Sequence, residues 1–168
     1  MSMKGGMMEP TPATLKAVAI LEGIRKDMLG RVSALSEEEA LRVPEGHRNC
    51  VHWHIGHMLH VQLAHWYPRR GEALPVDPGF RKYFADGRSP RDYDAETPSF
   101  ARLLEIYREY SFDLIRKYGG FLEAPLIKPF DYVNSHFATV ADDLFLLLYH
   151  EGEHGPLVTR LLRALGKA

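Results

Sequence analysis

Four segments of this chain carry apolar residues at steps of three and four positions, the spacing that places side chains on one face of an α-helix. The segments run from Thr11 to about Ala34, from Asn49 to the residue before Pro68, from Thr97 to about Tyr118 and from Thr139 to Gly166. Residues 119 to 137 show only weak patterns for short strands. The sequence therefore predicts an all-α fold, an up-down four-helix bundle whose apolar faces meet in one core.

The connections between these segments also carry local signals. Ser36 precedes three glutamates, a capping-box pattern that predicts one short helix closed before Pro44. Residues 68–98 are rich in Pro, Gly, Asp and Arg and predict a long loop between the second and third helices, of a length that is often functional or mobile. Pro156 lies inside the fourth helix and predicts a kink just after His154.

Composition narrows the class of protein. The 168 residues predict one domain over residues 1–168, with residues 1–10 as a flexible tail. The formal net charge of -1 and the pI near 6.8 argue against nucleic acid as a partner. No apolar run approaches the roughly 20 residues that cross a bilayer, and the first residues lack the hydrophobic segment of a secretory signal. One cysteine, Cys50, is typical of a reducing compartment, so we expect a cytoplasmic protein with no membrane partner.

The strongest chemical signal is the string His150-Glu151-Gly152-Glu153-His154. Histidines at positions i and i+4 share one helix face, within reach of a single metal ion. Both fall on the apolar stripe of their helix, which directs them to the core. The string also matches the H-E-x-x-H motif of zinc proteases, which take a third ligand from residues after the motif. No His, Asp, Glu or Cys follows His154, and this absence argues against a protease.

A third ligand must therefore come from another helix. His57 lies at the centre of the apolar stripe of the second helix, between Trp53 and Val61. The sequence predicts a divalent-metal site formed by His57, His150 and His154. Three imidazoles leave coordination positions for water or substrate, which is the pattern of a catalytic site. Zinc or nickel is the expected ion, and iron, manganese and copper are alternatives that imidazole ligands also accept.

Other side chains are predicted to lie around this site, in the second shell or the pocket: Asp143, Trp53, His54, His60 and Cys50. Asp143 would accept a hydrogen bond from a ligand histidine or pair with another core polar group. For Cys50, a small buried hydrophobe is favoured over a thiolate ligand or nucleophile. His52 and His65 lie farther from the apolar stripe and are predicted to be surface residues.

The catalytic role of the two glutamates in the string is open. Glu151 projects about 60° from His154 around the helix and is the candidate general base. Its alternative is a solvated helix residue, and Glu153 on the opposite flank has the same alternatives. A zinc ion would lower the pKa of a bound water for hydrolysis, whereas a bound thiol would become a thiolate for group transfer.

Two strings resemble signatures of the DinB/YfiT-like family. Residues 49–57, Asn-Cys-Val-His-Trp-His-Ile-Gly-His, are similar to its Asn-x-x-x-Trp-x-x-Gly-His helix, and His150-x-x-x-His154-Gly155 is similar to its second signature. The likeness covers about residues 11–166, although Pro156 stands where members commonly carry Gln. It implies a four-helix bundle, a divalent metal on His57 and the histidine pair, and frequently a homodimer.

The resemblance leaves the function class open. Family members include metal-dependent hydrolases and S-transferases that use a low-molecular-weight thiol, and many have no assigned reaction. We therefore expect a metal-dependent hydrolase acting on a small-molecule substrate, or else a metal-dependent thiol S-transferase. The alternative from a different class is a non-catalytic metal- or ligand-binding protein of a stress response.

Overall fold

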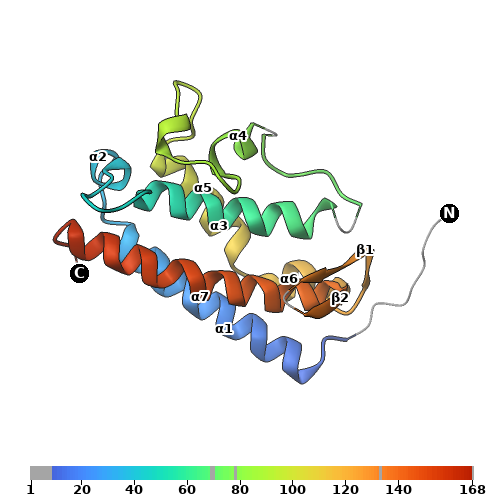
Figure 1. Ribbon diagram of the computed structural model, residues 1–168. Helices are drawn as coiled ribbons and strands as arrows, with labels where there is room; N and C mark the ends of the chain where they lie inside the picture. The colour runs from blue at the N-terminus through green and yellow to red at the C-terminus, as the bar shows by residue number, and fades with distance from the viewer. Residues whose placement is uncertain (1–8, 69–70, 78, 133, 168) are drawn as a thin grey trace.

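The computed structural model describes residues 9–68, 71–77, 79–132 and 134–167, so most of the predicted N-terminal tail lies outside the described residues. The chain is mostly helical with a small two-stranded sheet (Figure 1). The longer helices are α1 (Pro12–Val32), α3 (Val51–Trp66), α5 (Phe100–Ser111) and α7 (Val140–Ala164). Shorter helical segments are α2 (Glu37–Leu41), α4 (Phe80–Phe84), η2 (Pro90–Asp92), α6 (Leu114–Tyr118) and η3 (Gly119–Phe121).

Side-chain caps set the starts of several helices. The Thr11 side chain accepts a hydrogen bond from the amide of Thr14 at the start of α1. Ser36 begins α2 with the predicted capping box, and Thr139 begins α7 with another, in which Asp142 bonds back to the Thr139 amide. Ser99 caps α5, two residues after the predicted start at Thr97.

The third predicted helix is not continuous, and its prediction to Tyr118 was wrong. Helix α5 ends at Ser111, and Asp113 adopts a left-handed backbone conformation with φ of 59° before α6 begins. The carboxylate of Glu22 on α1 accepts a hydrogen bond of 2.7 Å from the amide of Leu114, the first residue of α6. This tertiary contact caps a new helix start at a position where the local pattern alone favours continuation.

The chain is not purely all-α, because strands β1 (Pro125–Tyr132) and β2 (Ser135–Thr139) form an antiparallel hairpin. Phe130 and Phe137 face each other across the strands with stacked rings 4.8 Å apart. Asn134 in the turn has a φ of 57°, a conformation that Asn tolerates better than most residues. Cross-strand aromatic packing of this kind stabilises the hairpin in a segment where the sequence shows only weak patterns for short strands.

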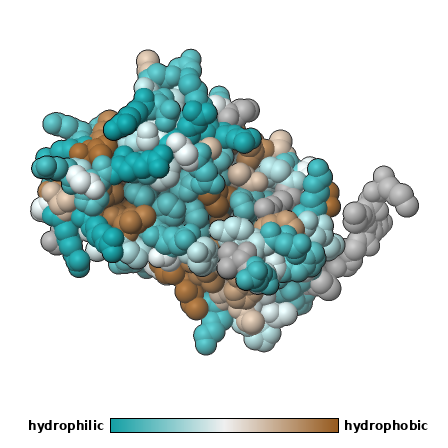
Figure 2. Space-filling model, viewed as in Figure 1, coloured by the Kyte–Doolittle hydropathy of each residue, from teal (hydrophilic) through white to brown (hydrophobic). Residues whose placement is uncertain are grey.

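Helix α7 packs against α1 along one side and against α3 along another, and α5 packs against α3 (Figure 1). Pro156 lacks the amide hydrogen that would bond within the helix, yet α7 continues through it from Val140 to Ala164. The predicted long loop contains α4, which packs on α3. Hydrophilic residues cover most of the face shown in Figure 2, and its apolar residues form separate groups.

Two apolar clusters make up the core of the described residues, and a polar layer separates them along α7. One cluster includes Val140, Leu144 and Leu147 of α7, whereas the α7 residues of the other begin at Val158. On α1, Leu21 belongs to one cluster and Met28 to the other. The histidine pair and its glutamates occupy α7 between the two clusters. Among the described helices, none is long and apolar enough to cross a membrane.

Candidate metal centre

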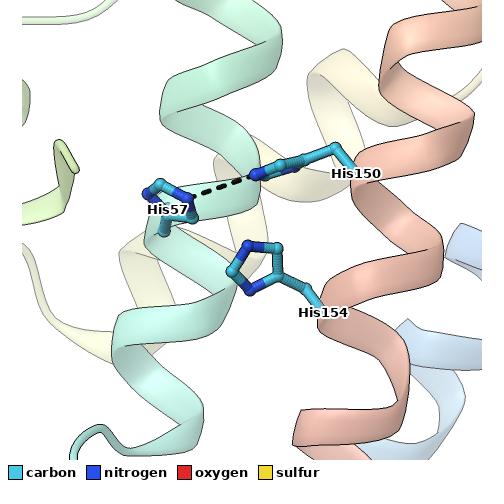
Figure 3. A group of neighbouring side chains, drawn as sticks. All are labelled: His57, His150 and His154. Atoms are coloured by element: carbon cyan, nitrogen blue, oxygen red, sulfur yellow. Dashed lines mark hydrogen bonds between the residues drawn. The ribbon is translucent and has the colours of Figure 1, made fainter. Parts of the chain in front are cut away.

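Three histidine side chains from two helices converge in the polar layer. His57 comes from α3, and His150 and His154 come from successive turns of α7, with all three rings directed into the space between the helices (Figure 3). One ligand nitrogen from each ring lies within 4.8 Å of the other two. The Nε2 atoms of His57 and His150 are 3.2 Å apart. The structure thus brings together the three histidines that the sequence singles out.

Packing and one hydrogen bond fix the His57 ring. Its Nδ1 donates to the backbone carbonyl of Phe84 over 2.7 Å, and Trp53 stacks on the ring with centroids 4.6 Å apart. Because a carbonyl can only accept, Nδ1 carries the hydrogen and the Nε2 lone pair faces the other histidines. Gly56 makes this possible, since a Cβ there would lie 2.3 Å from the Phe84 ring. Trp53 and Gly56 therefore help to hold the His57 ring in this orientation.

His54 on α3 orients a histidine ring of α7 in a similar way. Its Nδ1 lies 2.8 Å from Nδ1 of His154, so one of these two atoms donates to the other. If His154 donates, its Nε2 lone pair is free for an ion, and the outer hydrogen bond fixes the ring as such bonds do in metal sites. His54 is buried and therefore contacts the ligand directly, rather than facing solvent.

The two histidines of α7 and their neighbour His54 have the protonation state that metal binding requires. Burial lowers the pKa of His54 and His150 to about 3 and that of His154 to about 4, and the neighbouring histidines lower these pKa values further. Neutral imidazole is the form that binds metal ions, because the ligand must offer a lone pair. At neutral pH protons therefore do not compete with an ion for these rings.

Replacing His54 with alanine is expected to weaken metal binding by about 10–100-fold, the usual effect of removing an outer hydrogen-bond partner of a ligand. The His154 ring then loses the bond that holds its orientation. Competition with a chromophoric chelator measures the dissociation constant. His136→Ala is the control, because His136 is an exposed hairpin residue paired with Asp131. Equal dissociation constants for His54→Ala and the control would contradict this role.

Glu151, the candidate general base, has a structural partner instead. Its carboxylate accepts a hydrogen bond of 2.8 Å from Nε of Arg25 on α1, and both side chains are 1% exposed. A carboxylate held this way faces α1 rather than the histidine cluster. Neither alternative from the sequence describes it, because Glu151 is not a solvated residue either.

Glu153 is the glutamate of the string that faces the site. It lines a cavity of about 400 Å³ together with the three histidines, and its carboxylate accepts a hydrogen bond of 2.8 Å from the hydroxyl of Tyr149. The hairpin contributes Phe130 and Tyr132 to the same cavity. The cluster therefore opens on one side to a space large enough for a small molecule.

The remaining candidates divide between the site and the core. Asp143 is buried near His65, whose Nδ1 lies 3.7 Å from its carboxylate. His60 is partly buried and lines a neighbouring cavity of about 710 Å³. Cys50 lies in the apolar core, where burial raises the pKa of its thiol to about 11, which favours a buried hydrophobe over a thiolate.

The surface prediction for His52 was wrong. The residue is fully buried, and its ring bonds the hydroxyl of Tyr93 over 2.9 Å and the carbonyl of Pro98 over 2.8 Å. Its two partners come from the segment between α4 and α5, which this histidine ties to α3. His65 is only partly exposed and lines the cavity beside the cluster.

Two contributors to the site lie in the long loop and were not predicted. One is the carbonyl of Phe84, which holds His57. The other is Asp86, whose Oδ1 lies 3.6 Å from Nε2 of His57. Every residue has a backbone carbonyl, so the sequence cannot indicate which one accepts a hydrogen bond. Asp86 is one of several aspartates in the loop. Only the packing of α4 on α3 distinguishes them.

Comparison with protein families agrees with this geometry. The family model described as the DinB superfamily matches residues 20–157. The chain belongs to the DinB superfamily. This superfamily is known for metal binding, and the three-histidine cluster of the present member lies where the resemblance to DinB/YfiT-like proteins places its ligands. No curated protein sequence matches this DinB-superfamily chain significantly.

The residues present fit a divalent ion. The cluster offers three nitrogen donors, two of which have their rings oriented by hydrogen bonds on the opposite ring atom. Nitrogen-rich sites of this kind suit zinc and its transition-metal neighbours, whereas calcium and magnesium prefer oxygen donors. The donor set does not distinguish between the transition metals.

Proposed function

We propose that this DinB-superfamily protein is a metal-dependent hydrolase that acts on a small molecule bound in the cavity beside the histidine cluster. The observation that carries the proposal is the joint geometry of three converging imidazoles and an open space of about 400 Å³ in front of them. A closed structural site would have a fourth protein ligand held as firmly as the other three, and no such opening.

In this proposal His57, His150 and His154 hold the ion, which supplies a Lewis acid when bound. Phe84 and His54 hold two of the rings in place through their hydrogen bonds. The Tyr149 hydroxyl and the Glu153 carboxylate form a hydrogen-bonded pair on the cavity wall. This pair would orient the substrate, or the Glu153 carboxylate would take a proton. Acting as the general base is the role for which the sequence makes Glu151 the candidate.

The proposal extends to the arrangement and setting of the chain. The long helices α1, α3, α5 and α7 would form the four-helix bundle of a cytoplasmic homodimer. Their contacts are consistent with such a bundle, since α7 meets both α1 and α3, and α3 meets α5. Size-exclusion chromatography with light scattering tests the dimer.

The experiment that tests the function begins with protein purified without a nickel-affinity tag. After incubation with zinc or nickel and removal of free ion, we expect about one ion per chain by elemental analysis. The loaded protein is then assayed on esters, amides and phosphoesters, with chelator-treated protein as the control. Chelator-sensitive hydrolysis supports the proposal, whereas failure to take up any metal contradicts it. Metal uptake without hydrolysis, but with thiol transfer to an electrophile, would favour the S-transferase.

A further inference from the structure

Asp86 is placed at the histidine cluster by a rigid piece of the fold. Helix α4 ends at Phe84, whose ring packs on Gly56 and whose carbonyl accepts the hydrogen bond from His57. Because both contacts involve neighbouring residues of α3, the end of α4 has little freedom to move relative to the site. Asp86 follows two residues after Phe84, so the position of its backbone is fixed by the same contacts.

A tight turn presents the Asp86 side chain. The amide of Arg88 bonds to the carbonyl of Ala85 over 3.1 Å, which closes the turn around Asp86 and Gly87. Gly87 has a φ of 80°, the conformation that a type II turn requires at its third residue and that glycine adopts without strain. Asp86 therefore occupies the tip, with its side chain 98% exposed and free to rotate.

The distances around His57 are those of metal ligands. Two atoms bound to one ion at about 2.1 Å, with angles between octahedral and tetrahedral, stand roughly 3.0–3.5 Å apart. Nε2 of His57 lies 3.2 Å from Nε2 of His150 and 3.6 Å from Oδ1 of Asp86. The carboxylate lies outside the set of nitrogens that are all within 4.8 Å of one another. It thus neighbours His57, and a shared ion would require the exposed Asp86 side chain to rotate toward the other two rings.

A divalent ion on the three histidines would attract the negative charge of the Asp86 carboxylate. An imidazole that binds a metal contributes no charge, so a divalent ion on the three histidines would keep its full charge beside a low-dielectric core. Within the described part of the chain, the Asp86 carboxylate makes no hydrogen bond that would compete. Glu153 also lines the cavity, but its carboxylate is already bonded to Tyr149.

We propose that Asp86 is a fourth, exchangeable protein ligand of the three-histidine site, which a substrate or other small anion displaces. The inference rests on the proposed function, since it needs an ion on His57, His150 and His154. It assigns the loop turn at Ala85–Arg88 a function in controlling access to the ion. A carboxylate on an exposed turn suits this role, because it binds without being locked in place.

The test uses full-length protein loaded with cobalt(II), whose visible absorption reports the number and type of its ligands. Asp86→Asn and Asp86→Ala are compared with wild type, and Asp131→Asn is the control, because Asp131 is an exposed hairpin carboxylate outside the cavity. We expect both Asp86 variants to bind cobalt at least about tenfold more weakly, the lower bound for groups that support a metal ligand. Their spectra should change, and azide should bind the loaded variants more tightly than it binds wild type.

The outcomes separate the two proposals. Weaker cobalt binding and altered spectra in both Asp86 variants, with Asp131→Asn like wild type, support the fourth ligand. Wild-type affinity, spectrum and azide binding in both Asp86 variants overturn it and leave the three-histidine site standing. Absence of cobalt binding by wild type itself overturns the proposed function and this inference together. Circular dichroism checks that the variants are folded, which the exposure of Asp86 leads us to expect.

Discussion

Replacing Glu151 with alanine is expected to lower the free energy of unfolding by about 3–5 kcal/mol, because it leaves a buried charge without its partner. Arg25 and Glu151 are each 1% exposed and joined by a hydrogen bond of 2.8 Å. For a domain of this size the loss corresponds to a fall in melting temperature on the order of 10 °C. Urea denaturation of metal-free protein, followed by circular dichroism, measures it.

A double variant separates the ion pair from simple loss of packing. Arg25→Met combined with Glu151→Leu removes both charges and keeps apolar volume, a change that is often neutral or stabilising in buried pairs. We expect it to recover most of the stability lost in Glu151→Ala. Metal affinity should stay within about tenfold of wild type in the double variant, below the effect of removing a group that supports a ligand. A stable Glu151→Ala protein that binds metal normally but has lost hydrolysis would instead restore the general-base role.

The three histidines could be predicted because their positions depend on local sequence patterns within single helices. The spacing of His150 and His154 depends only on helix geometry, and the apolar stripes of two helices indicate which histidines face inward. His57 follows from the same rule, with Trp53 and Val61 beside it. The pattern predicts the folded arrangement here because helices α3 and α7 pack against each other.

The partners of these histidines depend on contacts that no local pattern encodes. Glu151 and Glu153 flank the ligand face equally in sequence, but α1 supplies Arg25 on one side and the cavity opens on the other. Asp86 becomes a neighbour of His57 only because α4 folds back onto α3. The break between α5 and α6 likewise depends on Glu22, a residue of α1.

Replacing His57 with alanine is expected to weaken zinc or cobalt binding by more than about 100-fold, beyond the range for groups that only support a ligand. The variant removes the one ligand from α3 and leaves both remaining nitrogens on α7. Chelator competition measures the affinity, with His136→Ala as the surface control. Because His57 also packs against Trp53, His57→Gln is measured in parallel to keep the site filled. If both His57 variants bind metal as tightly as the control, the ion does not lie on this cluster.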